Sequence, residues 1–564
     1  MTVGDVIRRN ARDPEIRNRP FLLFGDLEIT HEEYYRESCR YARLFLSLRV
    51  PEEPFHVAVL LDNIPEFLFA LGGAALAGAV LVGINNTQRG EHLLRDIHHA
   101  DCQVLLLEPS GTELLVPVRG RLRIPEERIL VVTRWQGTSF PFGRALEPLL
   151  ETVPPEDPGV QVDEAAPLCL VFTSGTTGAP KAVVTSHRRM ISTGEYVGNL
   201  MGVGREDVGY LAMPLFHANS QQCGFMPALL RGARVGMIRK FSKSQWLSDV
   251  RRYGVTYFNY TGKPLAYILT TPRRPDDREN PLRVAYGNEG SKKITDEFAE
   301  RFGCTVLDGF GASEGGFGFV RRPEDPPGSV GKPPPEIKVL DETGKECPPA
   351  RFDAEGRILN PDEAIGEIVN TAGIGKFEGY YKNEEATRQR TRGGMYWSGD
   401  FGYKDERGYL YFTGRDASWL RVDGENFLAR PVEEILQRHP SVYLCCVYGV
   451  PDAQAGDRVM ATLVLADDAH FDGEEFLRFL RSQPDLSPKW IPTYLRIARD
   501  VPRTATNKPL VRELRREKFR LEVVRDPIYW HERADEPYRP FGPDDYERLK
   551  AEFRKHGREH LLDL

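Results

Sequence analysis

Short apolar runs alternate with longer amphipathic stretches from the start of the chain to about residue 310. The runs have the length and the β-branched content of buried strands, and they span residues 57–61, 103–107, 129–132, 168–172, 235–238 and 256–259. Strands that alternate with helices predict α/β layers with largely parallel sheets.

The pattern changes twice further along the chain. Residues 329–410 consist of short strands with Gly and Pro turns, which predicts a small β-rich subdomain. An acidic helix over 431–438 and strands over 442–450 and 460–465 then predict an α+β unit. Because 564 residues are too many for one core, we expect a large N-terminal domain (1–414) and a small C-terminal domain (415–564).

One uncharged stretch, residues 67–84, is long enough to be considered as a membrane span. It divides internally, because residues 67–77 fit a buried Ala-rich helix, Gly78 fits its end, and residues 79–84 fit a β-branched strand. Gly72 and Gly73 would let the helix pack closely against a sheet. The helix–strand interpretation is favoured, so any membrane contact would be peripheral.

Charge and cysteine content exclude several classes of protein. Lys and Arg total 75 and Asp and Glu total 82, which gives a net charge of −7 and argues against a nucleic-acid partner. The first residues are charged and contain no apolar segment of the kind that a secretory signal needs. Eight scattered cysteines without a CxxC pair fit a reducing cytoplasm.

The strongest chemical signal directly follows the predicted strand 168–172. The loop offers hydroxyls at Thr173, Ser174, Thr176 and Thr177, glycines at Gly175 and Gly178, and a cation at Lys181. Glycines let backbone N–H groups converge on an anion, and hydroxyls and lysine add donors and charge. The alternative is a polar turn, but this density of donors indicates a polyphosphate site. The spacing differs from the P-loop of kinases and ATPases.

With this loop, the chain resembles the adenylate-forming superfamily of acyl-CoA synthetases, adenylation domains and luciferases. Four further motifs match in the expected order over most of the chain. The greatest likeness, carried by residues 377–389, 408–426 and 526–546, is to very-long-chain acyl-CoA synthetases of the fatty-acid-transport-protein type. The resemblance implies a mobile C-terminal domain and ATP, Mg²⁺ and coenzyme A as cofactors.

The second motif is Asp308-Gly309-Phe310-Gly311-Ala312-Ser313-Glu314. An aromatic residue between two glycines can present its face to a planar base, and a carboxylate can hold Mg²⁺ together with phosphate oxygens. The resemblance implies that Phe310 stacks on adenine, that Ser313 contacts phosphate, and that Glu314 binds the metal.

The third motif comprises residues 396–400 and 408–415. A carboxylate can accept hydrogen bonds from two neighbouring ribose hydroxyls, which is the role implied for Asp400. Phe412 is similar to the residue that flanks adenine, and Arg415 to the one that contacts ribose or phosphate.

Two upstream segments resemble the acyl end of the site. His217 follows Met-Pro-Leu-Phe and corresponds to a histidine that lines the acyl tunnel, although a lone histidine is often a core residue. Gly287 and Asn288 fall where relatives place a loop against adenine and the substrate carboxylate, and Glu289 departs from the expected small residue. Candidates for an apolar acyl pocket are Phe225, Met226, Tyr257, Phe258, Tyr260, Leu265 and Tyr267.

The fifth motif places Lys508 in the C-terminal domain, where the family's lysine contacts the carboxylate and the α-phosphate during adenylation. Ala417 replaces the aspartate that many relatives use as a hinge, so the pivot of domain rotation is left open. Gly424 is the candidate for the pantetheine tunnel.

These motifs predict an ATP-dependent ligase that converts a hydrophobic carboxylic acid, long-chain or polycyclic and steroid-like, to acyl-AMP and then acyl-CoA. Lys181, His217, Glu314 and Lys508 are the catalytic candidates. Two alternatives stay open, namely transfer of the acyl group to a carrier protein and a non-catalytic acyl-binding or uptake protein. A dimer is the default expectation for assembly.

Overall fold

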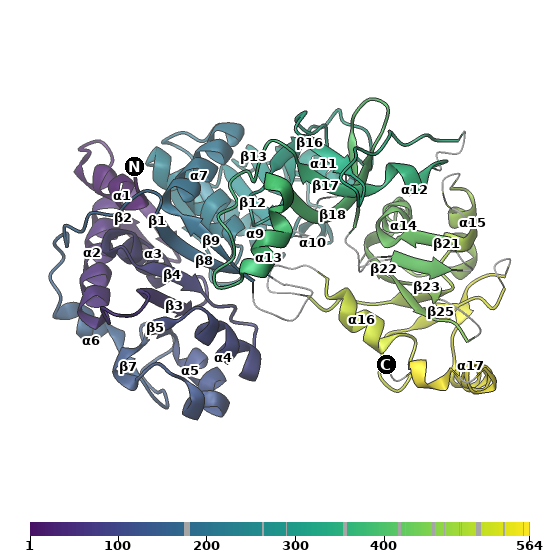
Figure 1. The fold of residues 1–564 in the computed structure, drawn as a ribbon, viewed down its shortest axis with the longest axis horizontal. Coiled ribbons are helices and arrows are strands. Elements are labelled where there is room, and N and C mark those ends of the chain that lie inside the picture. The colour runs from purple at the N-terminus through teal and green to yellow at the C-terminus, as the bar shows by residue number, and fades with distance from the viewer. Residues whose placement is uncertain are drawn as a thin grey trace.

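A seven-stranded sheet forms one layer of the N-terminal region of the computed structural model (Figure 1). The structure describes residues 1–564 except 174–180, 262–263, 289, 291, 354–357, 415–418, 423–424, 454–456, 467–468, 484–485, 487, 504–508, 534–535, 557 and 563–564. In order across the sheet, the strands are β7 (Arg144–Ala145), β6 (Ile129–Val131), β5 (Cys102–Leu107), β3 (His56–Leu60), β4 (Val80–Gly83), β8 (Pro167–Thr173) and β9 (Lys181–Ser186). All neighbours are parallel except β8 and β9.

A second, eight-stranded sheet is parallel except at its two edge pairs. Its order is β15 (Gly318–Arg321), β14 (Thr305–Gly311), β13 (Val284–Asn288), β12 (Tyr257–Thr261), β10 (Val208–Leu211), β11 (Arg234–Met237), β1 (Pro20–Phe24) and β2 (Leu27–Thr30). Tyr260, Gly287 and Asp308 face one another across β12, β13 and β14. Since ligands bind at the carboxyl ends of parallel strands, this row lies where a site is expected.

The apolar stretch at 67–84 forms the predicted helix and strand. Helix α3 (Pro65–Ala77) is buried along its whole length, and Gly78 ends it in the left-handed conformation (φ 69°). Gly72 and Gly73 do not face a sheet as expected. They pack on helix α2 (His31–Leu48), where a Cβ on Gly72 would come 2.1 Å from Ser38 Oγ and one on Gly73 2.6 Å from Tyr41 Cβ. In the part of the chain that the structure describes, no helix is long and apolar enough to cross a membrane.

A four-stranded antiparallel sheet follows in the region predicted to be β-rich. It consists of β16 (Ile337–Leu340), β17 (Gly366–Asn370), β18 (Tyr396–Lys404) and β19 (Leu410–Gly414). The hairpin β20 (Trp419–Val422) and β21 (Glu425–Leu428) comes next. The domain limits at 329–410 and 414/415 stay predictions, and residues 415–418 lie outside the described chain.

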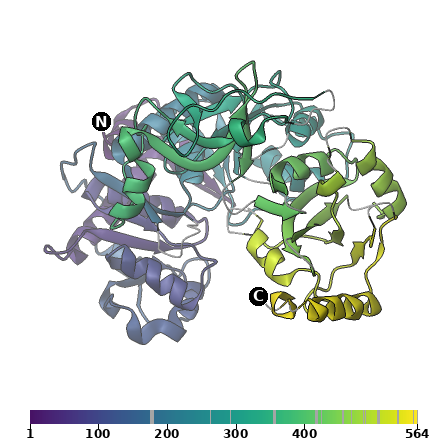
Figure 2. The ribbon, with the colours of Figure 1, turned by 45° about the vertical axis from the view of Figure 1, so that its right-hand side comes forward.

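The C-terminal part is built on a five-stranded mixed sheet, at the right of Figure 1. Its strands are β22 (Val442–Pro451), β23 (Asp457–Leu465), β24 (Tyr494–Ile497), β25 (Ile528–Trp530) and β26 (Arg539–Pro540). One apolar cluster joins the sheet to α14 (Ala429–Leu436) and α15 (Gly473–Arg481), and a second joins it to α16 (Val511–Glu517) and α17 (Pro543–Lys555). In Figure 2 this part stands beside the N-terminal layers.

The remaining helices precede β1 or lie in the connections between strands, those of the four-stranded sheet included. They are α1 (Val3–Arg12), α4 (Gly90–His99), α5 (Pro109–Leu115), α6 (Leu146–Glu151), α7 (His187–Met201), α8 (Met226–Arg231), α9 (Trp246–Tyr253), α10 (Pro264–Leu269), α11 (Lys292–Phe302), α12 (Pro361–Ala364) and α13 (Glu384–Arg390). Short helical turns are η1 (Val116–Arg121), η2 (Glu126–Arg128), η3 (Asn219–Phe225), η4 (Arg392–Gly394), η6 (Pro488–Trp490) and η7 (Glu559–Leu562). The predicted fold class, layered parallel sheets followed by a smaller α+β part, is confirmed.

Candidate active site

A cleft of about 2670 Å³ opens at the carboxyl ends of β12–β14 and extends to the four-stranded sheet and the C-terminal part. It gathers most of the predicted site residues that the structure describes. These are Thr173, Lys181, His217, Asn288, Asp308, Gly309, Phe310, Gly311, Ser313, Glu314, Asp400 and Phe412. Thr173 and Phe412, which are 239 residues apart in the chain, therefore meet in one cleft, because β8 ends there and β19 lines it.

Several predicted residues fall outside the described chain: Ser174, Gly175, Thr176, Thr177, Gly178, Glu289, Arg415, Ala417, Gly424 and Lys508. The two residues at the base of the phosphate loop, Thr173 and Lys181, are nevertheless described. Thr173 and Lys181 face each other as the last pair of β8 and β9, and Thr173 Oγ1 donates to the Lys181 carbonyl (3.4 Å).

The packing of three residues at the ends of β12, β13 and β14 explains why position 287 requires a glycine. The Tyr260 hydroxyl donates to Asp308 Oδ2 (2.6 Å), although the strand of Gly287 lies between them. A Cβ on Gly287 would come 2.5 Å from Tyr260 Cγ, so only glycine leaves room for the ring. Gly287 does not line the cleft and acts through this packing. Burial, and then the neighbouring Asp308 carboxylate, raise the Tyr260 pKa well above its usual value.

The same carboxylate ties the 287–290 segment to the second motif. The Gly290 backbone N–H donates to Asp308 Oδ2 (2.8 Å), and Asn288 Nδ2 donates to the Gly309 carbonyl (2.8 Å). Asp308, predicted as a nucleotide contact, thus also holds together two of the segments that line the cleft.

Tyr380 joins the predicted metal ligand to the phosphate loop. Its hydroxyl donates to Glu314 Oε1 (2.8 Å), and the Lys181 ammonium lies 5.8 Å from the centroid of its ring. Burial raises the Tyr380 pKa, so the phenol stays protonated and remains a donor. Lys181 and Glu314 therefore both contact Tyr380, a residue to which the motifs assign no role.

Arg189 supports the backbone of the segment that carries Ser313 and Glu314. Its guanidinium is buried, donates to the Ser313 carbonyl, and through Nη1 donates to the Val184 carbonyl (3.0 Å). Burial lowers its pKa, while the carboxylates of Glu378 and Glu314 act in the opposite direction. This cation fixes the backbone that presents Ser313 and Glu314.

Two aromatic rings and one carboxylate form the face expected to hold adenosine. The rings of Phe310 and Phe412 lie 5.4 Å apart at 49°. Asp400 follows Gly399, which has a positive φ of 69°, and β18 has an irregular register at residues 401–402. Bulges of this kind re-aim a side chain, and Asp400 lines the cleft.

The segment that carries His217 is held by buried amides. Asn63 Nδ2 donates to the Met213 carbonyl (2.9 Å), and its Oδ1 accepts from the Leu215 N–H (2.9 Å). The π-helical turn η3 follows, a geometry that recurs at functional sites. His217 lines the cleft beside Phe216, whose ring centroid is 4.5 Å from its own.

The expected apolar acyl lining was wrong. Phe225, Met226, Tyr257, Phe258, Tyr260 and Leu265 are fully buried in the core, and Tyr267 packs against the C-terminal part. The corresponding wall of the cleft is formed by Thr193, Tyr196, Val197, Phe216, Gln222, Cys223 and Tyr286. Aromatic content alone does not distinguish a lining residue from a core residue, because β12 is covered on both faces.

The sequence patterns did not mark Tyr380 or Arg189, and they placed Tyr260 in the acyl lining instead of beside Asp308. Tyr380 lies in the segment that carries the likeness to very-long-chain acyl-CoA synthetases, so its position was available, but its partner Glu314 is 66 residues away. Arg189 follows the loop by eight residues, and nothing in its surroundings marks it as buried.

Phe310 and Phe412, Asp400, and the lysine beside the phosphate-type loop line one cleft, the arrangement expected of a protein that binds adenosine phosphates. The family described as AMP-binding enzyme matches residues 7–381, and the AMP-binding enzyme C-terminal domain matches residues 431–508. The chain belongs to this family of AMP-binding enzymes.

Relatives and solved structures agree with this assignment. The chain is 45% identical over 538 residues to a steroid-22-oyl-CoA synthetase of Rhodococcus jostii (strain RHA1), covering 95% of each chain. It is 42% identical to the medium/long-chain-fatty-acid–CoA ligase FadD17 of Mycobacterium tuberculosis (strain ATCC 25618 / H37Rv), covering 90% of this chain and 95% of that one. The anthranilate CoA ligase AuaEII in complex with anthranoyl-AMP has the same fold, with a TM-score of 0.78 at 23% identity over 91% and 96% of the two chains.

These findings confirm the predicted superfamily, the prediction of an acyl-CoA synthetase, and the expectation of ATP and coenzyme A. The roles of the individual site residues stay predictions.

Proposed function

We propose that the protein activates a hydrophobic carboxylic acid in two steps, first to acyl-AMP and then to acyl-CoA. The observation that carries the proposal is the meeting of Lys181, Glu314, Phe310, Phe412 and Asp400 in one cleft, whose wall at α7 and η3 mixes apolar and polar groups. The names of the relatives, which act on steroid-22-oyl and medium- or long-chain acyl groups, support a bulky or long hydrocarbon acid.

In the first step a carboxylate oxygen attacks the α-phosphorus of ATP, and the bond to the β-phosphate oxygen breaks to release pyrophosphate. The protein must align the two reactants and neutralise negative charge on the phosphates. Lys181 supplies a cation at the base of the phosphate loop, and Lys508 is proposed to supply another at the α-phosphate.

Glu314 fits a magnesium ligand. Tyr380 occupies Oε1, and Oε2 makes no hydrogen bond to any residue that the structure describes. Mg²⁺ is commonly held by one or two carboxylates together with substrate phosphates. The ion, when bound with ATP, supplies positive charge at the phosphates.

In the second step the thiolate of coenzyme A attacks the acyl carbon and AMP leaves with the bonding electrons. Phe310 and Phe412 are proposed to hold the adenine, and Asp400 the ribose hydroxyls, throughout both steps. Rotation of the C-terminal part would withdraw Lys508 and bring the loop with Gly424 to the tunnel of the pantetheine arm.

The proposal predicts acid-dependent exchange of pyrophosphate into ATP, followed by thioester formation with free coenzyme A. Exchange without any thioester would favour an acyl-AMP ligase that delivers to a carrier protein, which is tested by adding a loaded carrier domain. Absence of exchange with a broad panel of acids would leave only an acyl-binding protein.

For straight-chain acids, kcat/KM is expected to rise by roughly fourfold per methylene until the pocket is full, because each buried CH₂ contributes about 0.8 kcal/mol. The assay uses straight-chain, hydroxylated and polycyclic acids on the wild type and on Glu289→Gly. A strong preference for one oxygenated acid that the substitution abolishes would contradict simple hydrocarbon recognition and assign the preference to Glu289.

Glu314→Gln should lower adenylation about 10²-fold and shift the magnesium dependence to higher concentration, because a carboxylate charge is lost at the phosphates. Pyrophosphate exchange measured across a magnesium titration checks this. Tyr380→Phe, which removes only the donor to Oε1, is the matched control and should cost less than about tenfold. Equal losses in both variants would argue against a metal role for Glu314.

We further propose a cytoplasmic location and a dimer. All eight cysteines lie among the described residues and are present as thiols, not as disulfides, which supports a reducing compartment. Sedimentation of the purified protein would check the assembly.

A further inference from the structure

Tyr267 connects the N-terminal region to the C-terminal part. It lies on α10, yet it is buried in an apolar cluster whose other buried members all come from residues 444–562. Only 7% of the residue is exposed. The ring therefore reaches out of its own layer and into the surface of the C-terminal sheet.

The face of this ring is covered by Arg503. The guanidinium carbon lies 3.6 Å from the ring centroid, a close cation–π stack, and the same guanidinium pairs with Asp500. The cation–π contact and the ion pair together define the direction of the Arg503 side chain.

Arg503 stands at the base of the segment that carries Lys508. Arg503 and Pro509 pair as an antiparallel bridge, and the Leu510 N–H donates to the Pro502 carbonyl (2.7 Å). The chain on both sides of residues 504–508 is thus tied together. Arg503, Pro509 and Leu510 line the same cleft as Lys181 and Glu314.

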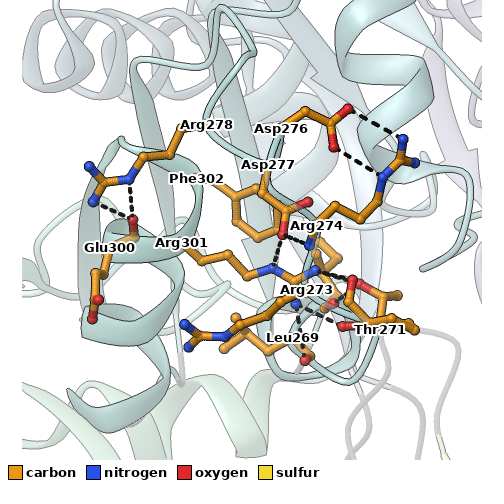
Figure 3. A network of polar contacts seen from close by, with 12 residues as sticks. Leu269, Thr271, Arg273, Arg274, Asp276, Asp277, Arg278, Glu300, Arg301 and Phe302 are labelled. Carbon is orange, nitrogen blue, oxygen red and sulfur yellow. Dashed lines mark hydrogen bonds and ion pairs between the residues drawn. The ribbon is translucent and has the colours of Figure 1, made fainter.

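The helix that carries Tyr267 is itself braced (Figure 3). Arg301 of α11 donates to the carbonyls of Leu269 (3.3 Å), Thr271 (2.9 Å) and Pro272 (2.8 Å), just beyond the end of α10. On the same helix, Lys293 Nζ donates to the carbonyls of Gln437 and His439, both at 3.0 Å, past the end of α14. Helices α10 and α11 therefore form one rigid platform with two contacts to the C-terminal part.

We propose that Tyr267 is a positioning residue for the adenylation step, because its ring holds Arg503 and thereby the base of the Lys508 segment at the cleft. The inference rests on the proposed function, in which Lys508 acts in adenylation. Tyr267 does not touch the substrates, so its effect is confined to the half-reaction that uses this domain orientation.

The test compares Tyr267→Leu, Tyr267→Phe and Arg503→Met in the full-length protein. Pyrophosphate exchange reports adenylation, and thioester formation from supplied acyl-AMP reports the second step. Tyr267→Leu and Arg503→Met should each lower exchange about tenfold and change thioester formation by less than about twofold. The double variant should lose little more than either single one, since both remove the same contact.

Tyr267→Phe keeps the ring and should retain most of the exchange rate, because the hydroxyl makes no hydrogen bond to a described residue. Equal losses in both half-reactions, additive losses in the double variant, or unchanged exchange would overturn the proposal. If Tyr267→Leu does not fold, Arg503→Met decides between the same outcomes, because the Arg503 side chain is 22% exposed and its replacement disturbs the core less. Lys508→Ala is assayed in parallel, so that a failure of the Tyr267 proposal can be distinguished from a failure of the proposed function. Unchanged exchange in Lys508→Ala would contradict the proposed role of Lys508 itself.

Discussion

Replacing Lys508 with alanine is expected to slow adenylation about 10²–10³-fold, the usual cost of removing one group that stabilises charge in the transition state. Thioester formation from supplied acyl-AMP should be nearly unchanged. The reason is that Lys508 lies on the C-terminal part, about ninety residues beyond the predicted boundary, and is expected to leave the cleft before coenzyme A reacts.

Rapid-quench measurement of acyl-AMP and of acyl-CoA in separate experiments gives the two rates. Lys489→Ala, at another lysine of the C-terminal part, is the matched control and should leave both rates within about twofold. Equal losses in the two half-reactions of Lys508→Ala would contradict the use of two domain orientations.

The elements of the fold could be predicted because their sequence signals are local. Strands β3, β5, β6 and β8 are short apolar runs between amphipathic stretches, and Gly78 marks the end of α3 through its left-handed conformation. The partner of Gly72 and Gly73 could not be predicted, because close packing against a sheet and against a helix such as α2 requires the same small residues.

The residues at the nucleotide end of the cleft could also be predicted from the sequence, because each motif places its polar groups within a few residues of a strand end. The partners that these residues contact from distant parts of the chain could not be predicted. The Tyr260–Asp308 hydrogen bond depends on the register of three parallel strands, and the Tyr380–Glu314 bond depends on how the connection from β17 to α13 packs against the residues that follow β14.

The acyl wall was predicted poorly for a physical reason. Residues in buried strands such as β12 are apolar on both faces, so Tyr257 and Phe258 could equally have faced a ligand or the core. The wall instead uses α7 and the turn η3, where Tyr196, Gln222 and Cys223 mix polar and apolar groups. Burial raises the pKa of the Cys223 thiol to about 12, so this cysteine adds a neutral, weakly polar group to the lining of the cleft.

Replacing Arg301 with methionine is expected to destabilise the N-terminal region by about 3–5 kcal/mol, because it leaves the Asp277 carboxylate buried without its cation. The Arg301–Asp277 ion pair is 2.7 Å long, and its side chains are only 3% and 5% exposed (Figure 3). Arg274→Met is the matched control, since Arg274 pairs with Asp276 at the surface and should contribute less than about 1 kcal/mol.

Urea unfolding followed by tryptophan fluorescence measures the change, because Trp246 packs against Phe302, the neighbour of Arg301, with ring centroids 4.8 Å apart. The double variant Arg301→Met/Asp277→Asn should recover part of the loss, since no unpaired charge stays buried. Equal destabilisation by Arg301→Met and Arg274→Met would contradict the buried pair as the brace of α10. A loss specific to Arg301, together with weaker pyrophosphate exchange at temperatures where the variant is folded, would show that this brace also carries the platform on which Tyr267 meets Arg503.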